Sequence, residues 1–468
     1  MKKKHCVVSI MVLVGIIMFT SVPTLLAEPG SNQIQVLYEG DKAFGHIEAL
    51  TSIGPRVAGS DAEKDAADLI AAEMESYGLD VEIQEFEINY YEELSDPELE
   101  QVSPTPTTYE EGVDFLTMNF SGSGDVTASV QAVDLNIPPT GGSTSGCEAA
   151  DFTGFTAGNI ALIQRGHCFY SQKAQNAENA GAVGVIIFNE GNTSERQGLL
   201  SGTLGGPGVN IPVTGTTFAL GQELYALTLA GSVTVHMFAD TIYQVRTSQN
   251  VIGTLEGLQP DQGIVYMGAH YDTVSAGPGA NDDASGVAAM LEAARLLATR
   301  GLKTAATKKF IAFGSKEIGL DGSYWYVEDN FNEVTDMCIG MINLDMIAVG
   351  DTLLLGNGAS SSLLEYTKDK ADAMGLVWGP FTAGNDGDHF YFEVVGCPVT
   401  FLKHSPDPYY HTTEDIIDKI QVDTLEENGE LATAVMYGWA KNPALRDKKA
   451  ATSSTAVFSY QGNGRAAK

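Results

Sequence analysis

From residue 250 onward, short apolar runs alternate with longer amphipathic segments, and this alternation restricts the fold more than any other feature. The pattern predicts strands at 264–269, 308–314, 338–344 and 398–403, and helices at 284–299, 360–374 and 421–441. Strands that alternate with helices form a mostly parallel sheet with helices on both faces. We therefore predict an α/β domain that binds its ligand at the carboxyl ends of the strands.

An earlier part of the chain fits the same domain. Residues 61–77 place apolar side chains on one helical face, and residues 81–86 alternate as a strand does. Residues 91–124 are acidic and rich in Ser, Pro and Thr, a composition that predicts a linker. From about 125 to 240, short β-rich runs are separated by Gly and Pro, which indicates a small module inserted into the larger domain.

The first residues have the pattern of an export signal. Lysines at 2–4 precede an apolar run that extends to about Phe19, and small and apolar residues follow up to Ala27. A retained anchor helix is the alternative, but the run is short for a membrane span of about 20 residues. We expect a signal peptide over 1–27 and a secreted, extracellular protein.

The predicted domain boundaries follow from these changes in composition. We expect the N-terminal part of the larger domain with its linker at 28–124 and the inserted module at 125–240. The rest of the larger domain should follow at 241–445, and a loosely ordered polar tail at 446–468.

The net charge excludes several kinds of partner. The 468 residues include 26 Lys and Arg against 60 Asp and Glu, and 44% are hydrophobic, which suffices for more than one core. A surface this acidic repels nucleic acids and anionic lipid headgroups. We expect no nucleic-acid partner, no stable membrane association once the signal is removed, and a monomer.

Four cysteines follow the predicted signal peptide. Cys147 and Cys168 lie in one Gly-rich segment, and because exported proteins can keep disulfides we predict that this pair is bridged. Cys338 and Cys397 lie in strand-like runs, and we expect them to be buried free thiols. None of the four has zinc-finger spacing.

The strand ends carry residues that suit metal chemistry. His270 and Asp272 follow the apolar run at 264–269 and, being two residues apart, point to the same side. Asp282 and Asp283 lie in a Gly-rich turn before a helix, where one of them is expected to be a simple helix cap. The other carboxylate can face His270 and bridge two divalent ions.

Three further strands each lead to a potential ligand. Glu317 follows the strand at 308–314, Asp345 follows the strand at 338–344, and His411 lies in the loop after 398–403. Each segment alone is weak evidence for a metal site, since strand ends commonly carry acidic residues. Together, however, two histidines and three carboxylates on the rim of one sheet suit zinc.

Five motifs in this order resemble those of the secreted bacterial di-zinc aminopeptidases of the leucyl-aminopeptidase type. They read GAHYDTV, GPGANDDASG, FGSKEIGLDGS, NLDM and YHTTED. The resemblance covers roughly residues 40–90 and 245–442. It implies a phosphorylase/hydrolase-like three-layer α/β fold with a mixed, mostly parallel central sheet, and hydrolysis of N-terminal residues from peptide or protein substrates.

The same resemblance implies roles for individual residues. His270 and Asp345 would hold one Zn²⁺, Glu317 and His411 the other, and Asp282 would bridge the two ions. Asp272 would accept a hydrogen bond from the imidazole of His270 and fix its tautomer. Tyr410 would donate to the developing oxyanion, and the pair Asp388 and His389 would shape the pocket.

The inserted module resembles a protease-associated (PA) domain. In families that carry such domains they are non-catalytic and influence substrate access or contacts. The resemblance is carried by Cys147, Asp151, Phe152, the run GNIALIQRG, Cys168, Lys173 and the run AENAGAVGVIIFN. A nucleotide-binding loop is the alternative, but no G-x-G-x-x-G opens a helix after a strand here.

The general-base position departs from the family pattern. The family has a Glu directly before the zinc-binding Glu, and this chain has Lys316. A charged Lys cannot accept a proton from the attacking water and return it to the leaving amine, and losing a general base costs about 10²–10⁴ in rate. A neutral Lys316, Asp386 or Glu393 are the alternative bases.

These observations leave a leading interpretation and its alternatives. We expect a secreted zinc aminopeptidase with two Zn²⁺ per chain, either active or impaired by Lys316. The alternatives are a catalytically inactive homologue that binds zinc or peptides, a metal-dependent carboxypeptidase or amidohydrolase on the same scaffold, and an adhesion protein that uses the inserted module for contact.

Overall fold

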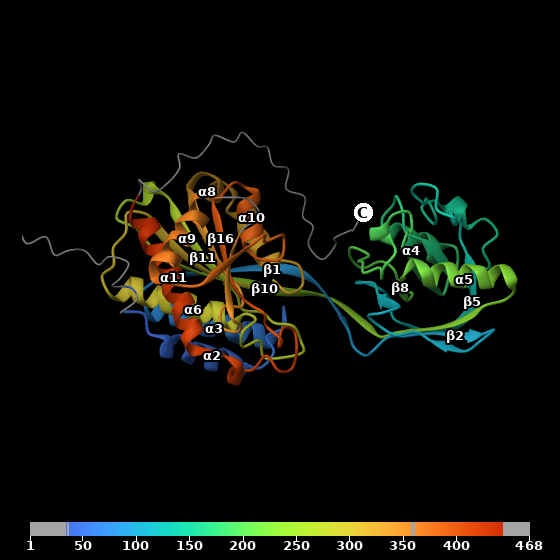
Figure 1. The fold of residues 1–468 in the computed structure, drawn as a ribbon, viewed down its shortest axis with the longest axis horizontal. Coiled ribbons are helices and arrows are strands. Elements are labelled where there is room, and N and C mark those ends of the chain that lie inside the picture. Colours follow the sequence, from blue (N-terminus) through green and yellow to red (C-terminus); the bar gives the residue numbers. More distant parts are fainter. Residues whose placement is uncertain (1–33, 35–36, 357–360, 443–468) are drawn as a thin grey trace, which may run out of the picture.

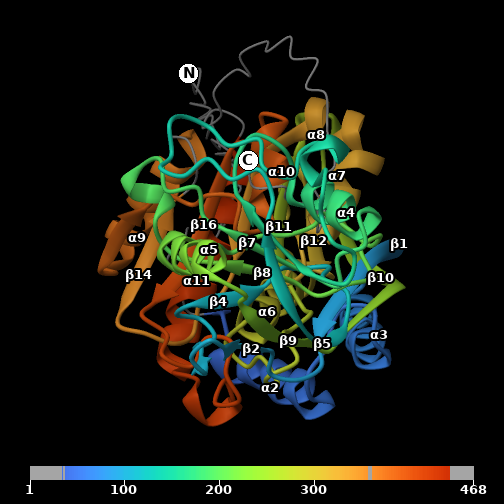
Figure 2. The ribbon, with the colours of Figure 1, turned by 90° about the vertical axis from the view of Figure 1, so that its right-hand side faces the viewer.

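The computed structural model describes residues 34, 37–356 and 361–442, so the predicted signal peptide over 1–27 and the predicted tail over 446–468 lie outside the described residues. The chain forms a larger domain and an inserted domain, joined by two long strands (Figure 1). After a rotation of 90° about the vertical axis, the inserted domain lies in front of the larger one (Figure 2).

The larger domain is built on a mixed sheet of eight strands. Their order across the sheet is β1 (Asp80–Glu93), β10 (Thr241–Leu255), β12 (Thr307–Phe313), β11 (Ile264–His270), β13 (Cys338–Leu344), β16 (Val399–Ser405), β14 (Thr352–Gly356) and β15 (Trp378–Phe381). The four central strands β12, β11, β13 and β16 are parallel. Their carboxyl ends therefore lie at one edge, as the predicted α/β rhythm requires.

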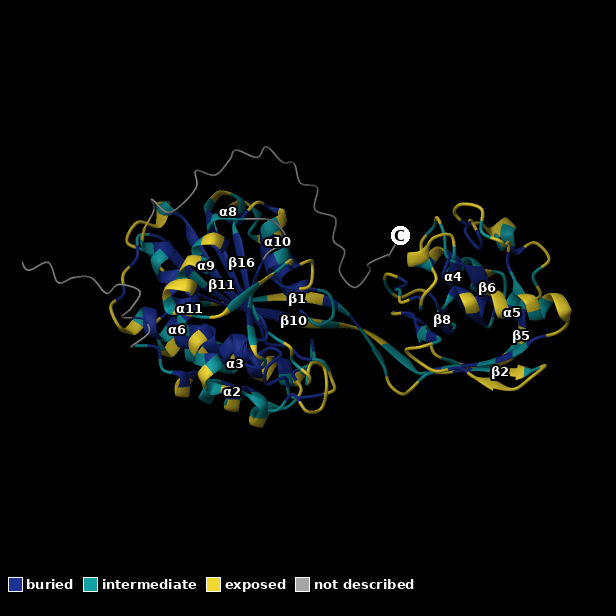
Figure 3. Cartoon of the chain, viewed as in Figure 1, coloured by how far each residue is buried: buried dark blue, intermediate teal, exposed yellow. Residues whose placement is uncertain are grey.

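Helices cover both faces of this sheet, which confirms the predicted three-layer fold. One face packs against α2 (Gly40–Ile53), α3 (Asp61–Ser76), α6 (Ala284–Thr299), α9 (Ser362–Met374) and α11 (Val422–Lys441). The other packs against α7 (Asp321–Asp329), α8 (Phe331–Met337) and α10 (His389–Val394). The central strands are buried on both sides (Figure 3), which explains why they read as continuous apolar runs.

The inserted domain has its own sheet and its own core. The strand order is β3 (Thr107–Thr108), β2 (Glu98–Ser103), β9 (Thr234–Ala239), β5 (Gly124–Ala132), β6 (Ile160–Gln164), β7 (Gly184–Phe188), β8 (Val213–Thr216) and β4 (Phe115–Thr117). Helices α4 (Tyr170–Asn179) and α5 (Phe218–Ala230) pack against it.

The interpretation of residues 91–124 as a linker is wrong. They contain the end of β1 and the strands β2, β3 and β4, and β2 pairs with β9 of the inserted domain. The segment is acidic because much of it faces solvent, although Leu99 and Phe115 are buried in the core of that domain. Composition alone does not distinguish a solvent-facing edge strand from a linker.

The connection between the domains is a continuous two-stranded ladder. β1 and β10 pair in antiparallel register from Asp80–Thr254 to Glu93–Thr241. Their far ends lead directly into the inserted domain, since β9 ends at Ala239 and β10 begins at Thr241. Backbone hydrogen bonds therefore continue from one domain to the other.

Both pairs of cysteines form disulfides. Cys147 and Cys168 are bridged, as predicted. The expectation that Cys338 and Cys397 are free thiols is wrong, because these residues are bridged too. Cys338 begins β13, and Cys397 lies just before β16, its parallel neighbour. The strand starts therefore lie side by side, which the sequence does not reveal without the strand order.

No helix in residues 37–356 and 361–442 is both long and apolar enough to cross a membrane.

Removing the Cys147–Cys168 bridge should destabilise the inserted domain. The bridge closes a loop with a sequence separation of 21, and a loop of that length stabilises by about 3 kcal/mol. The double variant Cys147→Ala/Cys168→Ala should lower the free energy of unfolding by about that amount in urea denaturation. The double variant and wild type, both with their disulfides reduced, differ only in the substituted side chains and serve as the control. An unchanged denaturation midpoint would contradict the role assigned to the bridge.

Candidate metal centre

The carboxyl ends of the parallel strands bring the predicted ligands together. His270 is the last residue of β11, and Asp345 is the first residue after β13. Glu317 follows β12 after a turn in which Ser315 has a positive φ of 57°. Asp282 precedes α6, and His411 lies in the loop after β16. Five side chains from four connections therefore face one edge of the sheet.

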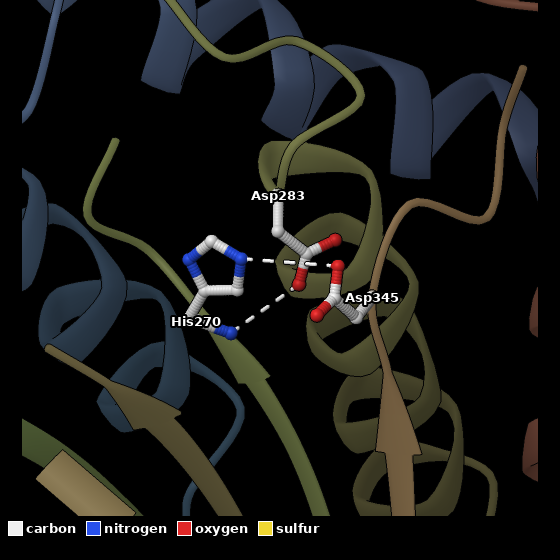
Figure 4. A group of neighbouring side chains, drawn as sticks. All are labelled: His270, Asp283 and Asp345. Atoms are coloured by element: carbon white, nitrogen blue, oxygen red, sulfur yellow. Dashed lines mark hydrogen bonds and ion pairs between the residues drawn. The ribbon is translucent and has the colours of Figure 1, made fainter. Parts of the chain in front are cut away.

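Asp283, not Asp282, is the helix cap. Its carboxylate accepts hydrogen bonds from Gly286 N in the first turn of α6, from His270 N and from Met346 N, at 3.0, 3.2 and 3.0 Å. Figure 4 shows Asp283 at the start of α6, facing His270 and Asp345 from the ends of two strands. One buried carboxylate thus ties α6 to β11 and to the residue after Asp345. Asp282 is left to face the centre.

Asp282 and Glu317 each contact both histidines. Nε2 of His270 lies 3.0 Å from Asp282 Oδ1 and 3.8 Å from Glu317 Oε1. Nε2 of His411 lies 3.2 Å from Asp282 Oδ2 and 3.1 Å from Glu317 Oε2. Asp282 thus lies between the two imidazoles, the position expected of a bridging ligand.

Asp345 completes the group from the other side. Its Oδ1 lies 3.9 Å from Nε2 of His270. Oδ1 is buried, and no hydrogen-bond partner reaches it among the described residues. A buried carboxylate oxygen without a donor is costly unless a cation contacts it. This orphaned atom and the mixed His/carboxylate donor set both fit a zinc ion.

Asp272 holds the turn that carries residues 316 and 317. Its Oδ1 and Oδ2 accept the backbone N–H groups of Lys316 and Glu317, both at 3.0 Å. Nδ1 of His270 lies 3.1 Å from the backbone oxygen of Asp272 and 3.4 Å from Oδ1. Asp272 therefore orients one proposed ligand through its ring and another through its backbone.

Lys316 reaches into the centre. Its Nζ lies 3.2 Å from Glu317 Oε1, 3.5 Å from Asp345 Oδ2 and 3.7 Å from Asp282 Oδ1. Burial lowers the pKa of this amine, but the three carboxylates outweigh burial and hold the pKa well above its ordinary value. These carboxylates therefore favour the ammonium form of Lys316, which cannot act as a base.

His411 is the more accessible of the two histidines. Burial lowers its pKa, but the hydrogen bonds to Asp282 and Glu317 prevail and raise the pKa to about 9. Its ring stacks on Tyr410, with centroids 3.8 Å apart. Tyr410 itself is 45% exposed, so its hydroxyl can meet a bound molecule.

A pocket of about 330 Å³ opens beside the centre and receives residues from both domains. Its lining is formed by Lys316, Glu317, Ile318, Gly319, Leu320, Asn385, Asp386, Tyr410 and His411 of the larger domain, with Asn119 and Thr203 of the inserted domain. Asp386, one of the alternative bases, is therefore part of this lining. Glu393 lies on α10 and is not part of the lining.

Asp388 and His389 are buried at the start of α10, next to this region. Burial raises the pKa of Asp388 to about 7 and lowers the pKa of His389 to about 4. The His389 ring packs against Phe401 of β16, with centroids 5.0 Å apart. Neither residue is part of the pocket lining, so their role in shaping the pocket stays a prediction.

Sequence reasoning missed two supports of the centre. Asp415 accepts the backbone N–H groups of Asn281 and Asp282, at 2.7 and 3.1 Å, and so fixes the proposed bridging ligand. The buried guanidinium of Arg56 donates to the backbone oxygens of Tyr271, Pro278 and Gly279. Asp415 lies in the YHTTED motif, and Arg56 ends the Gly-Pro-Arg segment at 54–56, within the range that the family resemblance covers. Their positions in these segments were the available sign of a role at the centre. Asn119 and Thr203 gave no comparable signal.

Comparison with known proteins identifies the family. Residues 250–436 match the model of peptidase family M28, and residues 126–224 match the PA domain. Aminopeptidase YwaD of Bacillus subtilis is 34% identical over 441 residues, which cover 89% of this chain and 90% of that protein. An aminopeptidase of Pseudomonas aeruginosa is 37% identical over 328 residues, but the match spans 69% of this chain and only 60% of that protein.

Solved structures agree with this assignment. The aminopeptidase from Aneurinibacillus sp. strain AM-1 is 32% identical with a TM-score of 0.71, over 88% of this chain and 96% of that one. BSAP, a zinc aminopeptidase from Bacillus subtilis, is 31% identical with a TM-score of 0.59, over 86% and 96%. The chain belongs to peptidase family M28 and carries an inserted PA domain, which confirms the family resemblance.

Losing the carboxylate of Asp272 should weaken zinc binding without removing a proposed ligand. Asp272→Ala leaves two backbone N–H groups without their partner and removes the Oδ1 contact of the His270 ring, which keeps the backbone oxygen. Loss of such support costs about 10–100-fold in metal affinity. Competition with a chromogenic chelator measures this change. Asp261→Ala, at an exposed position of the same domain, should leave the affinity unchanged. An affinity of Asp272→Ala within twofold of wild type would contradict the positioning role.

Proposed function

We propose that this protein is an exported zinc-dependent aminopeptidase that removes N-terminal residues from peptides. The observation that carries the proposal is the convergence of His270, Asp282, Glu317, Asp345 and His411 at the carboxyl edge of the sheet, beside an open pocket. Membership of family M28 and the names of the relatives, which are aminopeptidases, support the same reaction class.

The ligand roles follow from the contacts. His270 and Asp345 would hold one zinc ion, Glu317 and His411 a second, and Asp282 both. Zinc bound there would polarise the scissile carbonyl and lower the pKa of a bound water. Asp272, Asp283 and Asp415 keep the ligands in place through backbone hydrogen bonds.

Substrate contacts come from the open side of the centre. The Tyr410 hydroxyl would donate to the oxygen that gains charge during attack. The accessible edge of His411 and Asp386 lie along the same pocket. Asn119 and Thr203 of the PA domain line the same pocket, so this domain would limit the size of what enters.

Proton transfer is the weak step of the proposed reaction. Lys316 is surrounded by carboxylates that keep its ammonium charged, so it neither takes a proton from water nor gives one up readily. We therefore propose a slow enzyme, with Asp386 the pocket residue best placed to substitute as a base.

The ammonium of Lys316 also favours a second candidate function. It lines the pocket, where it repels the free amino group of a peptide and attracts a carboxylate. A metal-dependent carboxypeptidase or amidohydrolase would use such a cation. If Lys316 abolished hydrolysis altogether, the protein would be an inactive homologue that only binds peptides.

Export is part of the proposal. The apolar run near the N-terminus and the strongly acidic composition support it. The two disulfides support it as well, because such bonds persist in oxidising compartments.

Chelation should abolish hydrolysis of an aminoacyl anilide, and zinc should restore it. The substrate should lose its reactivity when its amino group is acetylated, because an aminopeptidase recognises that group. Initial rates with free and acetylated anilides, before and after dialysis against a chelator, measure both effects. Equal rates on the two substrates would favour the amidohydrolase. Activity that persists without metal would refute the metal centre as the catalyst.

Restoring the acid at position 316 should accelerate the reaction. Lys316→Glu places a carboxylate where the family has its general base, so kcat/KM should rise by about 10²–10⁴. Lys316→Gln removes the charge but supplies no base, and should stay within about tenfold of wild type. A wild-type rate already equal to that of Lys316→Glu would show that another group accepts the proton.

A further inference from the structure

Lys316 competes with metal ions for their own ligands. Its Nζ lies within 3.2–3.7 Å of one oxygen each of Glu317, Asp345 and Asp282. Asp345 is a proposed ligand of one zinc ion, Glu317 is a proposed ligand of the other, and Asp282 is the proposed bridging ligand. The Lys316 side chain is only 8% exposed, so bulk water and salt screen its charge poorly.

The charges of the three carboxylates that contact Nζ balance with one divalent ion and Lys316, and not with two ions and Lys316. These three carboxylates carry three negative charges. Asp272 and Asp283 carry charge as well, but their oxygens already accept backbone N–H groups. One Zn²⁺ together with the Lys316 ammonium supplies three positive charges. Two Zn²⁺ and the ammonium supply five.

The excess charge would be concentrated in a small volume. Zinc lies about 2.0–2.2 Å from a ligating carboxylate oxygen, so a zinc held by Glu317 or Asp345 lies less than about 6 Å from Nζ. In a buried site two like charges at this separation repel strongly. Withdrawing the ammonium from all three carboxylates would reduce the repulsion but leave that charge buried and unpaired. Losing the proton would reduce it as well, at the cost of the favourable contacts between the ammonium and the carboxylates.

We propose that Lys316 serves as a built-in cation that replaces one of the two divalent ions, so that the centre holds a single zinc ion. The proposal rests on the metal centre of the proposed function and revises its stoichiometry from two zinc ions to one. It assigns Lys316 a role in binding that is independent of its effect on proton transfer.

The number of zinc ions retained by each variant tests this directly. Full-length protein is stripped of metal, loaded with zinc, passed through a desalting column and analysed for zinc per chain. Wild type and Lys316→Arg should retain one ion. Lys316→Met, which removes the charge but keeps a long side chain, and Lys316→Glu should retain two. The second ion should bind at least about 100-fold more tightly to these two variants than to wild type.

Lys309→Met is the matched control. Lys309 lies on β12, the strand that leads to Lys316, and its Nζ pairs with Glu333 at 2.7 Å, away from the centre. This variant should retain one ion, as wild type does. A second ion gained here would show that loss of a lysine charge acts nonspecifically, and would overturn the proposal.

The outcomes separate this proposal from the proposed function. Two tightly bound ions in wild type would overturn the single-ion centre and leave the zinc peptidase intact. No zinc in wild type or in Lys316→Glu would overturn both. Titration of wild type with Co²⁺, followed by visible absorption, tests the proposal even if the variants do not fold: saturation at one equivalent supports it, and saturation at two contradicts it.

Discussion

Like charges buried at the edge of the sheet are the constraint on which the rest of the structure depends. Asp282, Glu317 and Asp345 converge from three connections, and removing ions of one sign from water costs several kcal/mol each unless cations offset it. The two histidines and Lys316 supply that compensation in the described chain. The supporting carboxylates of Asp272, Asp283 and Asp415 are satisfied by backbone N–H groups instead. The site is therefore a cation-binding centre first, and its chemistry follows from which cations occupy it.

The inserted domain is tied to this centre by secondary structure and not by a flexible tether. The β1–β10 ladder leaves the same sheet that carries the ligands and continues into the PA domain. Because the ladder fixes the direction in which that domain projects, Asn119 and Thr203 can contribute to the same pocket as Lys316 and His411. An insertion at this point of the chain thus adds residues of a second domain to the lining of the pocket beside the proposed ligands.

Much of the larger domain could be predicted from the sequence, because burial on both faces leaves an unambiguous pattern. Helix α6 covers the predicted 284–299, and β13 covers the predicted 338–344. Four of the proposed ligands follow apolar strands and Asp282 precedes a helix, and the family resemblance implied the role of each. What failed needed information about neighbours in space: the Cys338–Cys397 bridge depends on the adjacency of β13 and β16, and the edge strands in 91–124 have the composition of a linker. The choice between Asp282 and Asp283 likewise depended on which carboxylate reaches Gly286 N.

The most direct test is X-ray diffraction at the zinc absorption edge from crystals of the full chain grown with zinc. The account predicts an anomalous peak enclosed by His270, Asp282, Glu317, Asp345 and His411. Ordered density for all five side chains with no anomalous peak between them would contradict it.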